Sequence, residues 1–275
     1  MQTVKTDRLK YKLIAFSILA LLLIVLAFFS ESLCPYDPYE QNLAMAKAAP
    51  SAEHLLGTDR FGRDMLSRII AGSYTSIFST LLLVSFITVF GSLIGILCAW
   101  SGRWIDTLLM RLADMFLAFP GLVFALAVAA VLGGGVHNAI LALAAISWPK
   151  YARLARSQAL AQQSAPYMQA AKMAGNSTFQ MIRKHVLPNI AGPILVTAML
   201  DIGTMMMELA GLSFLGLGAK PPIPEWGSMM SDTRNLLATQ PWVTLSPGVA
   251  IFVSVMVFNL LGDAVRDWLD PKNRR

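Results

Sequence analysis

Two carboxylates stand in a stretch that is otherwise apolar. Asp201 and Glu208 are seven residues apart in the run 190–218, and Thr204 and Met205 lie between them. In a helix this spacing puts both carboxylates on one face. A charge at the centre of a membrane costs about 3 kcal/mol even on lenient insertion scales. We therefore expect both side chains to face a wet cavity or a partner.

This group of residues is a candidate translocation path. Carboxylates beside the thioethers of Met205, Met206 and Met207 can offer transient, low-affinity ligands to a divalent transition metal, with Asp201 and Glu208 as the metal contacts. The alternative is that the two carboxylates pair with basic groups of a partner subunit, while the methionines only pack.

The sequence lacks the common catalytic motifs. It contains no G-x-x-x-x-G-K-[ST] loop and no H-E-x-x-H helix. The three histidines fall on three different expected loops. Gly211-Leu212-Ser213-Phe214 lacks the second glycine of a nucleophile elbow. We expect no catalytic residue and no cofactor in this chain.

The composition indicates a polytopic membrane protein. Of the 275 residues, 56% are hydrophobic and 14% are charged, against about 25% charged residues in soluble domains. The net charge of +6 does not indicate nucleic acid, because Lys and Arg cluster beside the apolar runs. Cys34 and Cys98 are expected toward opposite sides of the membrane, which leaves both unpaired.

Apolar runs divide the chain into six expected spans. A cytoplasmic tail (1–12), a first span (13–30) and an extracytoplasmic loop (31–72) precede a core of five spans (73–262) and a cytoplasmic tail (263–275). The core spans are expected at 75–99, on either side of a tight turn at 133–135, at 190–218 and at 242–262. A short inner turn is expected around Arg103 to Arg111, with Asp114 pairing with Arg111.

The positive-inside rule orients these spans. Most of the 22 Lys and Arg residues fall in four segments, 1–12, 103–111, 150–184 and 263–275. This asymmetry places both termini and the segment 164–189 in the cytoplasm.

Segment 164–189 reads as two short helices joined by a bend. Ser164 is the expected cap of the first helix, and Pro166 is tolerated in its first turn. Gly175 permits a turn of positive φ, and Ser177 with Gln180 forms a capping-box pattern for the second helix. Pro188 is expected to end that helix.

The motifs of this segment resemble the cytoplasmic signature of permease subunits in binding-protein-dependent ABC importers. The matching residues are Gln169-Ala170-Ala171, Gly175 and His185-Val186-Leu187-Pro188. The family usually has Glu where this chain has Gln169.

Further motifs resemble those of the peptide/nickel group of these permeases. They are Cys34 to Pro38, His54 to Asp64, Leu212 to Gly218, Pro221-Pro222 with Glu225-Trp226-Gly227, and Gly262 to Pro271. Leu200 to Gly203, Met205-Met206, Trp148 with Tyr151 to Arg153, and Thr239 to Pro241 look most similar to the nickel-import C-type permease. Nickel(II), free or chelated, is therefore the expected cargo; dipeptides or oligopeptides, or another metal or metallophore, are the alternatives.

The resemblance implies an all-α fold, with six transmembrane helices in the type I ABC importer arrangement and a cytoplasmic coupling-helix loop. It implies a multi-pass protein of the cell (inner) membrane of a bacterium or archaeon. The implied partners are a second homologous permease in a heterodimer, two ATP-binding subunits that use ATP and Mg, and an extracytoplasmic solute-binding protein.

The resemblance also assigns residues to two contacts. Those expected to couple to the ATP-binding subunits are Tyr167, Gln169, Ala170, Ala171, Ala174, Gly175, Leu187 and Pro188. Those expected to face the solute-binding protein are Pro221, Pro222, Glu225 and Trp226. A scaffold or sensor permease without transport, and an ion-driven secondary transporter, remain the alternatives from other functional classes.

Overall fold

The computed structural model describes residues 2–270, with side chains described from residue 9 onward. Within that part the chain is helical and contains no strand, which confirms the all-α prediction. The α-helices are α1 (Gln2–Phe28), α2 (Ser30–Leu33), α3 (Met65–Trp100), α4 (Arg103–Ala118), α5 (Gly121–Val131), α6 (Val136–Gln163), α7 (Pro166–Met173), α8 (Thr178–Met181), α9 (Leu187–Phe214), α10 (Trp226–Thr233) and α11 (Pro241–Leu269).

Four helical segments of the described chain are long and apolar enough to cross a membrane. They are Leu9–Phe28, Met65–Trp100, Thr178–Phe214 and Pro241–Leu269, and α4 with α5 makes a fifth if that bent pair is one span. The fourth expected span, which follows the turn at 133–135, corresponds to α6; this helix carries Lys150, Arg153 and Arg156 and is not among these segments. The count of six therefore stays a prediction.

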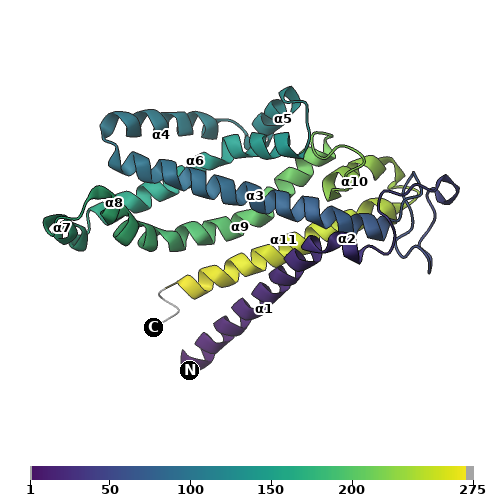
Figure 1. The fold of residues 1–275 in the computed structure, drawn as a ribbon, viewed down its shortest axis with the longest axis horizontal. Coiled ribbons are helices and arrows are strands. Elements are labelled where there is room, and N and C mark those ends of the chain that lie inside the picture. Colours follow the sequence, from purple (N-terminus) through teal and green to yellow (C-terminus); the bar gives the residue numbers. More distant parts are fainter. Residues whose placement is uncertain (1, 271–275) are drawn as a thin grey trace.

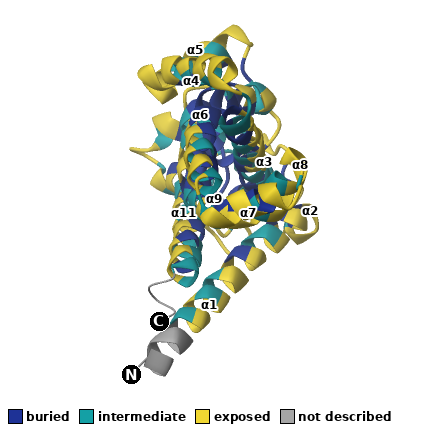
Figure 2. Cartoon of the chain, turned by 90° about the vertical axis from the view of Figure 1, so that its left-hand side faces the viewer, coloured by how far each residue is buried: buried dark blue, intermediate teal, exposed yellow. Residues whose placement is uncertain are grey.

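The core lies between α3, α6 and α9. In Figure 1 these helices run side by side, with α11 against α9 and α1 against α11. Figure 2 shows buried residues concentrated in this centre, whereas α1, α4 and α5 are largely exposed. We call the end with the loop 34–64 and α10 the loop end, and the end with α7 and α8 the coupling end (Figure 1).

Close packing of α3 on α6 depends on two glycines one helical turn apart. A Cβ on Gly91 would lie 2.7 Å from the Cβ of Tyr151, and a Cβ on Gly95 would lie 2.9 Å from the Cβ of Ala155. Glycines four residues apart let the helix backbones approach closely. This contact fixes the position of α6 along α3.

The loop at the loop end is shorter than predicted, because α3 starts at Met65 rather than near residue 73. Asp64 caps the helix, and its side chain accepts a hydrogen bond from the Ser67 N–H at 2.7 Å. The loop before it is tied down by a buried ion pair between Arg63 and Asp59, at 2.6 Å. A cap followed by an apolar run is a helix start that sequence can reveal.

The expected third span is bent. The axes of α4 and α5 differ by 94°, and the break falls at Phe119, which is extended, and Pro120. Proline removes a backbone donor and disfavours helical geometry in the residue before it. The tight turn that follows is confirmed, since Gly133, Gly134 and Gly135 all have positive φ.

The predicted inner turn at 103–111 is wrong, because these residues begin α4. Asp106 in this helix accepts two hydrogen bonds from Arg156 of α6, at 2.5 and 2.6 Å. Asp114 pairs with Arg153 of α6 and not with Arg111. Pairing across helices holds α4 against α6.

The described residues of the two predicted tails are helical apart from Asp270. Helix α1 already includes residues 2–12, and α11 continues through residues 263–269. The remainder of the predicted C-terminal tail, 271–275, lies outside the described residues.

Candidate functional site

The coupling end is a helix-turn-helix built largely as its sequence predicts. Pro166 occupies the first turn of α7, Gly175 turns the chain at φ +81°, and Ser177 and Gln180 form the capping box of α8. The cap of α7 is Ala165 rather than Ser164. The serine hydroxyl instead donates to the carbonyl oxygen of Ala161 in α6.

The predicted coupling residues divide into an exposed set and one buried member. Exposed are Tyr167, Gln169, Ala170, Ala174, Gly175, Leu187 and Pro188. Ala171, by contrast, is 8% exposed and packs inward, like Met168. The expected docking role of Ala171 is therefore wrong: its methyl group supports α7 from within, and Ala171→Asp would damage this element rather than only a contact.

Two exposed apolar side chains at this end were not among the predicted coupling residues. Met173 is 90% exposed and Phe179 is 71% exposed, on either side of the Gly175 turn. Large apolar side chains in a polar segment are the sequence signal for them, because exposed apolar groups often mark a site of contact with another protein.

A groove of about 400 Å³ lies beside these residues. It is formed by the end of α3 and by the helix-turn-helix, and its lining includes Gln169 and Lys172. Gln169 thus presents a neutral amide at a hollow of the coupling end.

Pro188 does not end a helix, contrary to the prediction. Residues 182–186 form one π-helical turn that joins α8 to α9, and Pro188 sits in the first turn of α9. A wider turn relieves the clash between the proline ring and the carbonyl four residues earlier. Residues 178–214 are consequently one helical segment.

Near the middle of α9, Asp201 is bound by side chains of this chain. The Lys150 ammonium lies 2.6 and 2.9 Å from its two carboxylate oxygens, and the Tyr151 hydroxyl donates to it at 2.8 Å. Asp201 is buried, whereas the Lys150 side chain is 54% exposed. The predicted basic partner thus exists, but it belongs to α6 of the same chain and not to another subunit.

The remaining path candidates lie at different depths on α9. Thr204 is exposed, Glu208 is half-buried, and Met205 is buried against the Ser147 hydroxyl. Within the described residues, Glu208 has no hydrogen-bond or ion-pair partner, and no three His, Cys, Asp or Glu side chains gather in a metal-binding group. Metal contact by Asp201 and Glu208 stays a prediction.

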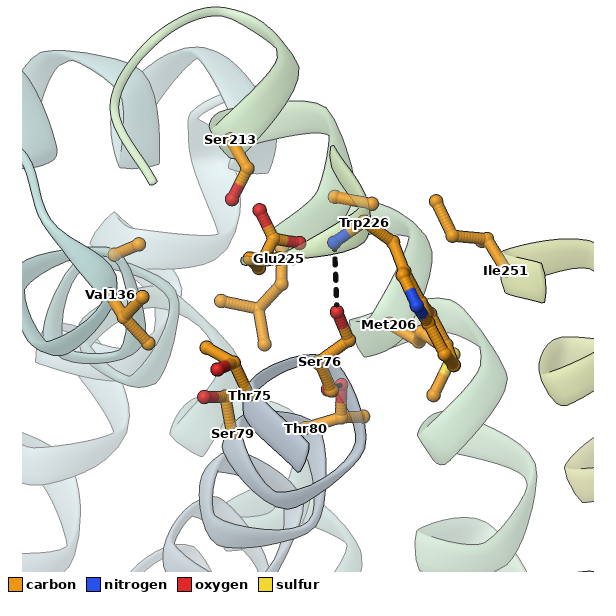
Figure 3. A pocket seen from close by; sticks show the side chains of 13 residues that line it. Thr75, Ser76, Ser79, Thr80, Val136, Met206, Ser213, Glu225, Trp226 and Ile251 are labelled. Atoms are coloured by element: carbon orange, nitrogen blue, oxygen red, sulfur yellow. Dashed lines mark hydrogen bonds between the residues drawn. The ribbon is translucent and has the colours of Figure 1, made fainter. Parts of the chain in front are cut away.

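At the loop end, Glu225 and Trp226 are inside the protein. Both side chains are at most 5% exposed, which corrects their predicted place on a partner-facing surface. Figure 3 shows the Glu225 carboxylate directed toward Ser213 and the backbone N–H of Trp226 bonded to the Ser76 hydroxyl, at 3.1 Å. Pro221 and Pro222 remain exposed in the loop before them.

Glu225 acts as the cap of α10. Its oxygens accept hydrogen bonds from the backbone N–H groups of Gly227 and Ser228, at 2.9 and 2.8 Å. Burial raises the pKa of Glu225, and these hydrogen bonds oppose that shift. The residue thereby holds α10 against α3 and α9.

Comparisons with known proteins identify relatives along most of the chain. Residues 91–275 match the family model described as "Binding-protein-dependent transport system inner membrane component". The chain is 41% identical over 249 residues to the dipeptide transport system permease protein DppC of Alkalihalophilus pseudofirmus, covering 90% of this chain and 82% of that protein. It is 42% identical over 256 residues to the probable D,D-dipeptide transport system permease protein DdpC of Escherichia coli K12, covering 93% and 86%.

Two further comparisons extend this similarity. The chain is 38% identical over 260 residues to the glutathione transport system permease protein GsiD of Pectobacterium atrosepticum, covering 94% and 86%. Among solved structures, an inward-facing conformation of the MetNI methionine ABC transporter aligns with a TM-score of 0.60 at 18% identity, over 75% of this chain and 98% of that one. At this identity the structural match shows the fold alone.

Proposed function

Because the chain belongs to the family of binding-protein-dependent inner membrane transport components and is a permease subunit of an ABC importer, we propose that the cargo it helps to move is a short peptide. The permease works with ATP-binding and substrate-binding partners. A heterodimer with a second permease and two copies of the ATP-binding subunit remain part of the proposal.

The choice of a peptide as the cargo rests on the relatives. The three reported above are named for dipeptides, D,D-dipeptides and glutathione, all of them short peptides. They favour the peptide alternative over the nickel cargo expected from short motifs. The engagement of Asp201 by Lys150 agrees with this choice, because an ammonium at the carboxylate competes with a cation.

The coupling end fits an element that receives mechanical work from a partner. We assign the exposed Tyr167, Ala170 and Ala174, with Met173 and Phe179, to the contact with an ATP-binding subunit. Apolar groups on a small protruding element bury well in a cleft of a partner. Movement of that partner then passes into α9 through the continuous helix 178–214.

In this proposal the coupling end and both termini are cytoplasmic, as the basic residues indicate. The loop end is then extracytoplasmic and receives the solute-binding protein. Pro221 and Pro222 are exposed there, while Glu225 and Trp226 brace the loop from beneath.

Uptake of labelled dipeptide and of radioactive nickel by the same cells tests the cargo. Cells lacking the gene are complemented with the wild-type chain or with Ala170→Asp, at equal membrane levels. We expect dipeptide uptake with the wild-type chain and none with the variant, and no difference in nickel uptake. Nickel uptake that depends on the wild-type chain, without dipeptide uptake, would refute the peptide assignment.

A further inference from the structure

The pair formed by Lys150 and Asp201 occupies the middle of its two helices. Lys150 is the fifteenth of the 28 residues of α6, and Asp201 is the fifteenth of the 28 residues of α9. Each lies about 20 Å from either end of its helix. Asp201 belongs to a helical segment, Thr178–Phe214, that is long and apolar enough to cross a membrane, and Lys150 lies at its level.

The lysine is only partly used by this pair. An ammonium has three donors, and the two hydrogen bonds to Asp201 leave one donor without a partner. More than half of the Lys150 side chain is exposed, although its carboxylate partner is buried. An exposed ammonium at this depth is strongly disfavoured against lipid. This face of α6 must therefore look onto water or onto another polar surface.

A second charge lies on the same side. Glu208 is half-buried without a hydrogen-bond partner in the described residues and is within electrostatic range of both Lys150 and Asp201. Seven residues of α9 separate it from Asp201, which is about 10.5 Å along the helix. The exposed Thr204 lies between them.

The rise of about 10.5 Å between Asp201 and Glu208 is within about 2–3 Å of the length that a short zwitterion needs. Two extended residues measure about 7 Å from end to end, and an ion-pair hydrogen bond of about 2.8 Å at each end brings the total to about 12–13 Å. We propose that Lys150 and Glu208 form a transient path site for a short peptide, in which Lys150 contacts the terminal carboxylate and Glu208 contacts the terminal ammonium. The proposal rests on the peptide-importer function proposed above.

Asp201 has a defined part in this site as a positioning residue. Without substrate it neutralises Lys150 and holds the ammonium at the edge of the buried core. A passing carboxylate takes the spare donor while Asp201 keeps the other two. Contact therefore does not require the ion pair to break first, which suits a site that must release its ligand.

The test uses the complete importer in proteoliposomes, with the binding protein preloaded with a dipeptide. Two rates are measured, peptide entering the vesicles and ATP hydrolysed. The informative variants are Lys150→Met with Asp201→Asn, which removes both charges together and leaves no buried charge unpaired, and Glu208→Gln. Lys220→Met, at an exposed lysine in the loop after α9, is the control.

We expect the neutral pair and Glu208→Gln each to lower the peptide moved per ATP about tenfold, as for the loss of one charge-assisted hydrogen bond. ATP hydrolysis stimulated by the loaded binding protein should stay within about twofold of wild type, and the conservative variant Lys150→Arg should retain most of the transport. A wild-type ratio of peptide to ATP in the neutral pair would overturn the site. So would an equal fall of both rates, since that marks a structural role. If the wild-type importer moves no dipeptide at all, it is the proposed function that fails.

Discussion

The close contact of α3 with α6 makes a quantitative prediction about stability. Replacing both Gly91 and Gly95 with Ala forces two methyl groups against the backbone and Cβ atoms of α6, within 3 Å at both sites. Overpacking of this kind costs about 1–3 kcal/mol per site. Alanine also favours a helix by about 1 kcal/mol over glycine. The net loss in the free energy of unfolding is therefore about 0–2 kcal/mol per site and about 0–4 kcal/mol for the double variant.

Two other helical glycines provide a matched control. Gly192 and Gly211 of α9 have no atom within 4 Å of an added Cβ, so Gly192→Ala and Gly211→Ala gain helix propensity without a clash. Unfolding in mixed micelles with increasing denaturing detergent compares the two pairs. The α3 variant should unfold at lower detergent than wild type, and the α9 variant at equal or higher detergent. The packing argument fails if the two double variants unfold at the same detergent concentration.

Three shorter predictions concern the ends of the molecule. Met173→Ser with Phe179→Ser should weaken binding of the ATP-binding subunit at least tenfold in a pull-down from detergent, while the permease itself melts at an unchanged temperature. Ala171→Asp should lower the melting temperature of the permease, because Ala171 is buried. Ala170→Asp, at an exposed position, should abolish uptake and leave the melting temperature unchanged. The reverse pattern would contradict the assignment of Ala171 to the buried face of α7 and of Ala170 to the exposed face. Burial raises the pKa of Glu225, so its contribution to stability is full below its ordinary pKa of about 4.3 and is lost as pH rises through the raised value. Wild-type stability should fall relative to Glu225→Gln between acidic and neutral pH, and parallel melting curves of the two proteins would contradict this sign.

Local signals predicted local structure well. The turn at Gly175 and the capping box of Ser177 and Gln180 are formed by residues three or four apart, so the sequence contains the whole interaction. The effect of a proline on a helix was harder to predict. Pro120 breaks a span and Pro188 does not, because a π-turn can absorb the second ring and no sequence rule announces that turn.

Contacts between side chains distant in sequence could not be predicted. Asp201 was recognised as a functional candidate, but its partner Lys150 lies 51 residues away on another helix. The sequence places Lys150 only at the start of a basic segment, 150–184. Only the packing of α3, α6 and α9 reveals that the two side chains share one level. Glu225 and Trp226 show the reverse case, since residues typical of an exposed loop were buried by the capping of α10.

The π-turn at 182–186 joins α8 and α9 into one continuous helical segment. Its 37 residues span about 55 Å, and Asp201 lies about 20 Å from its far end. If that end is the pivot, a push of about 5 Å on the Thr178 end, the size of a one-turn shift, moves Asp201 by about 2 Å. In the proposed function, a movement of an ATP-binding partner would therefore reach Asp201 reduced to less than half of its size. Two glycines inserted at 182–186 should make this helical segment flexible at that point. ATP hydrolysis should then continue while peptide uptake stops. Uptake at the wild-type rate would show that the movement takes another route.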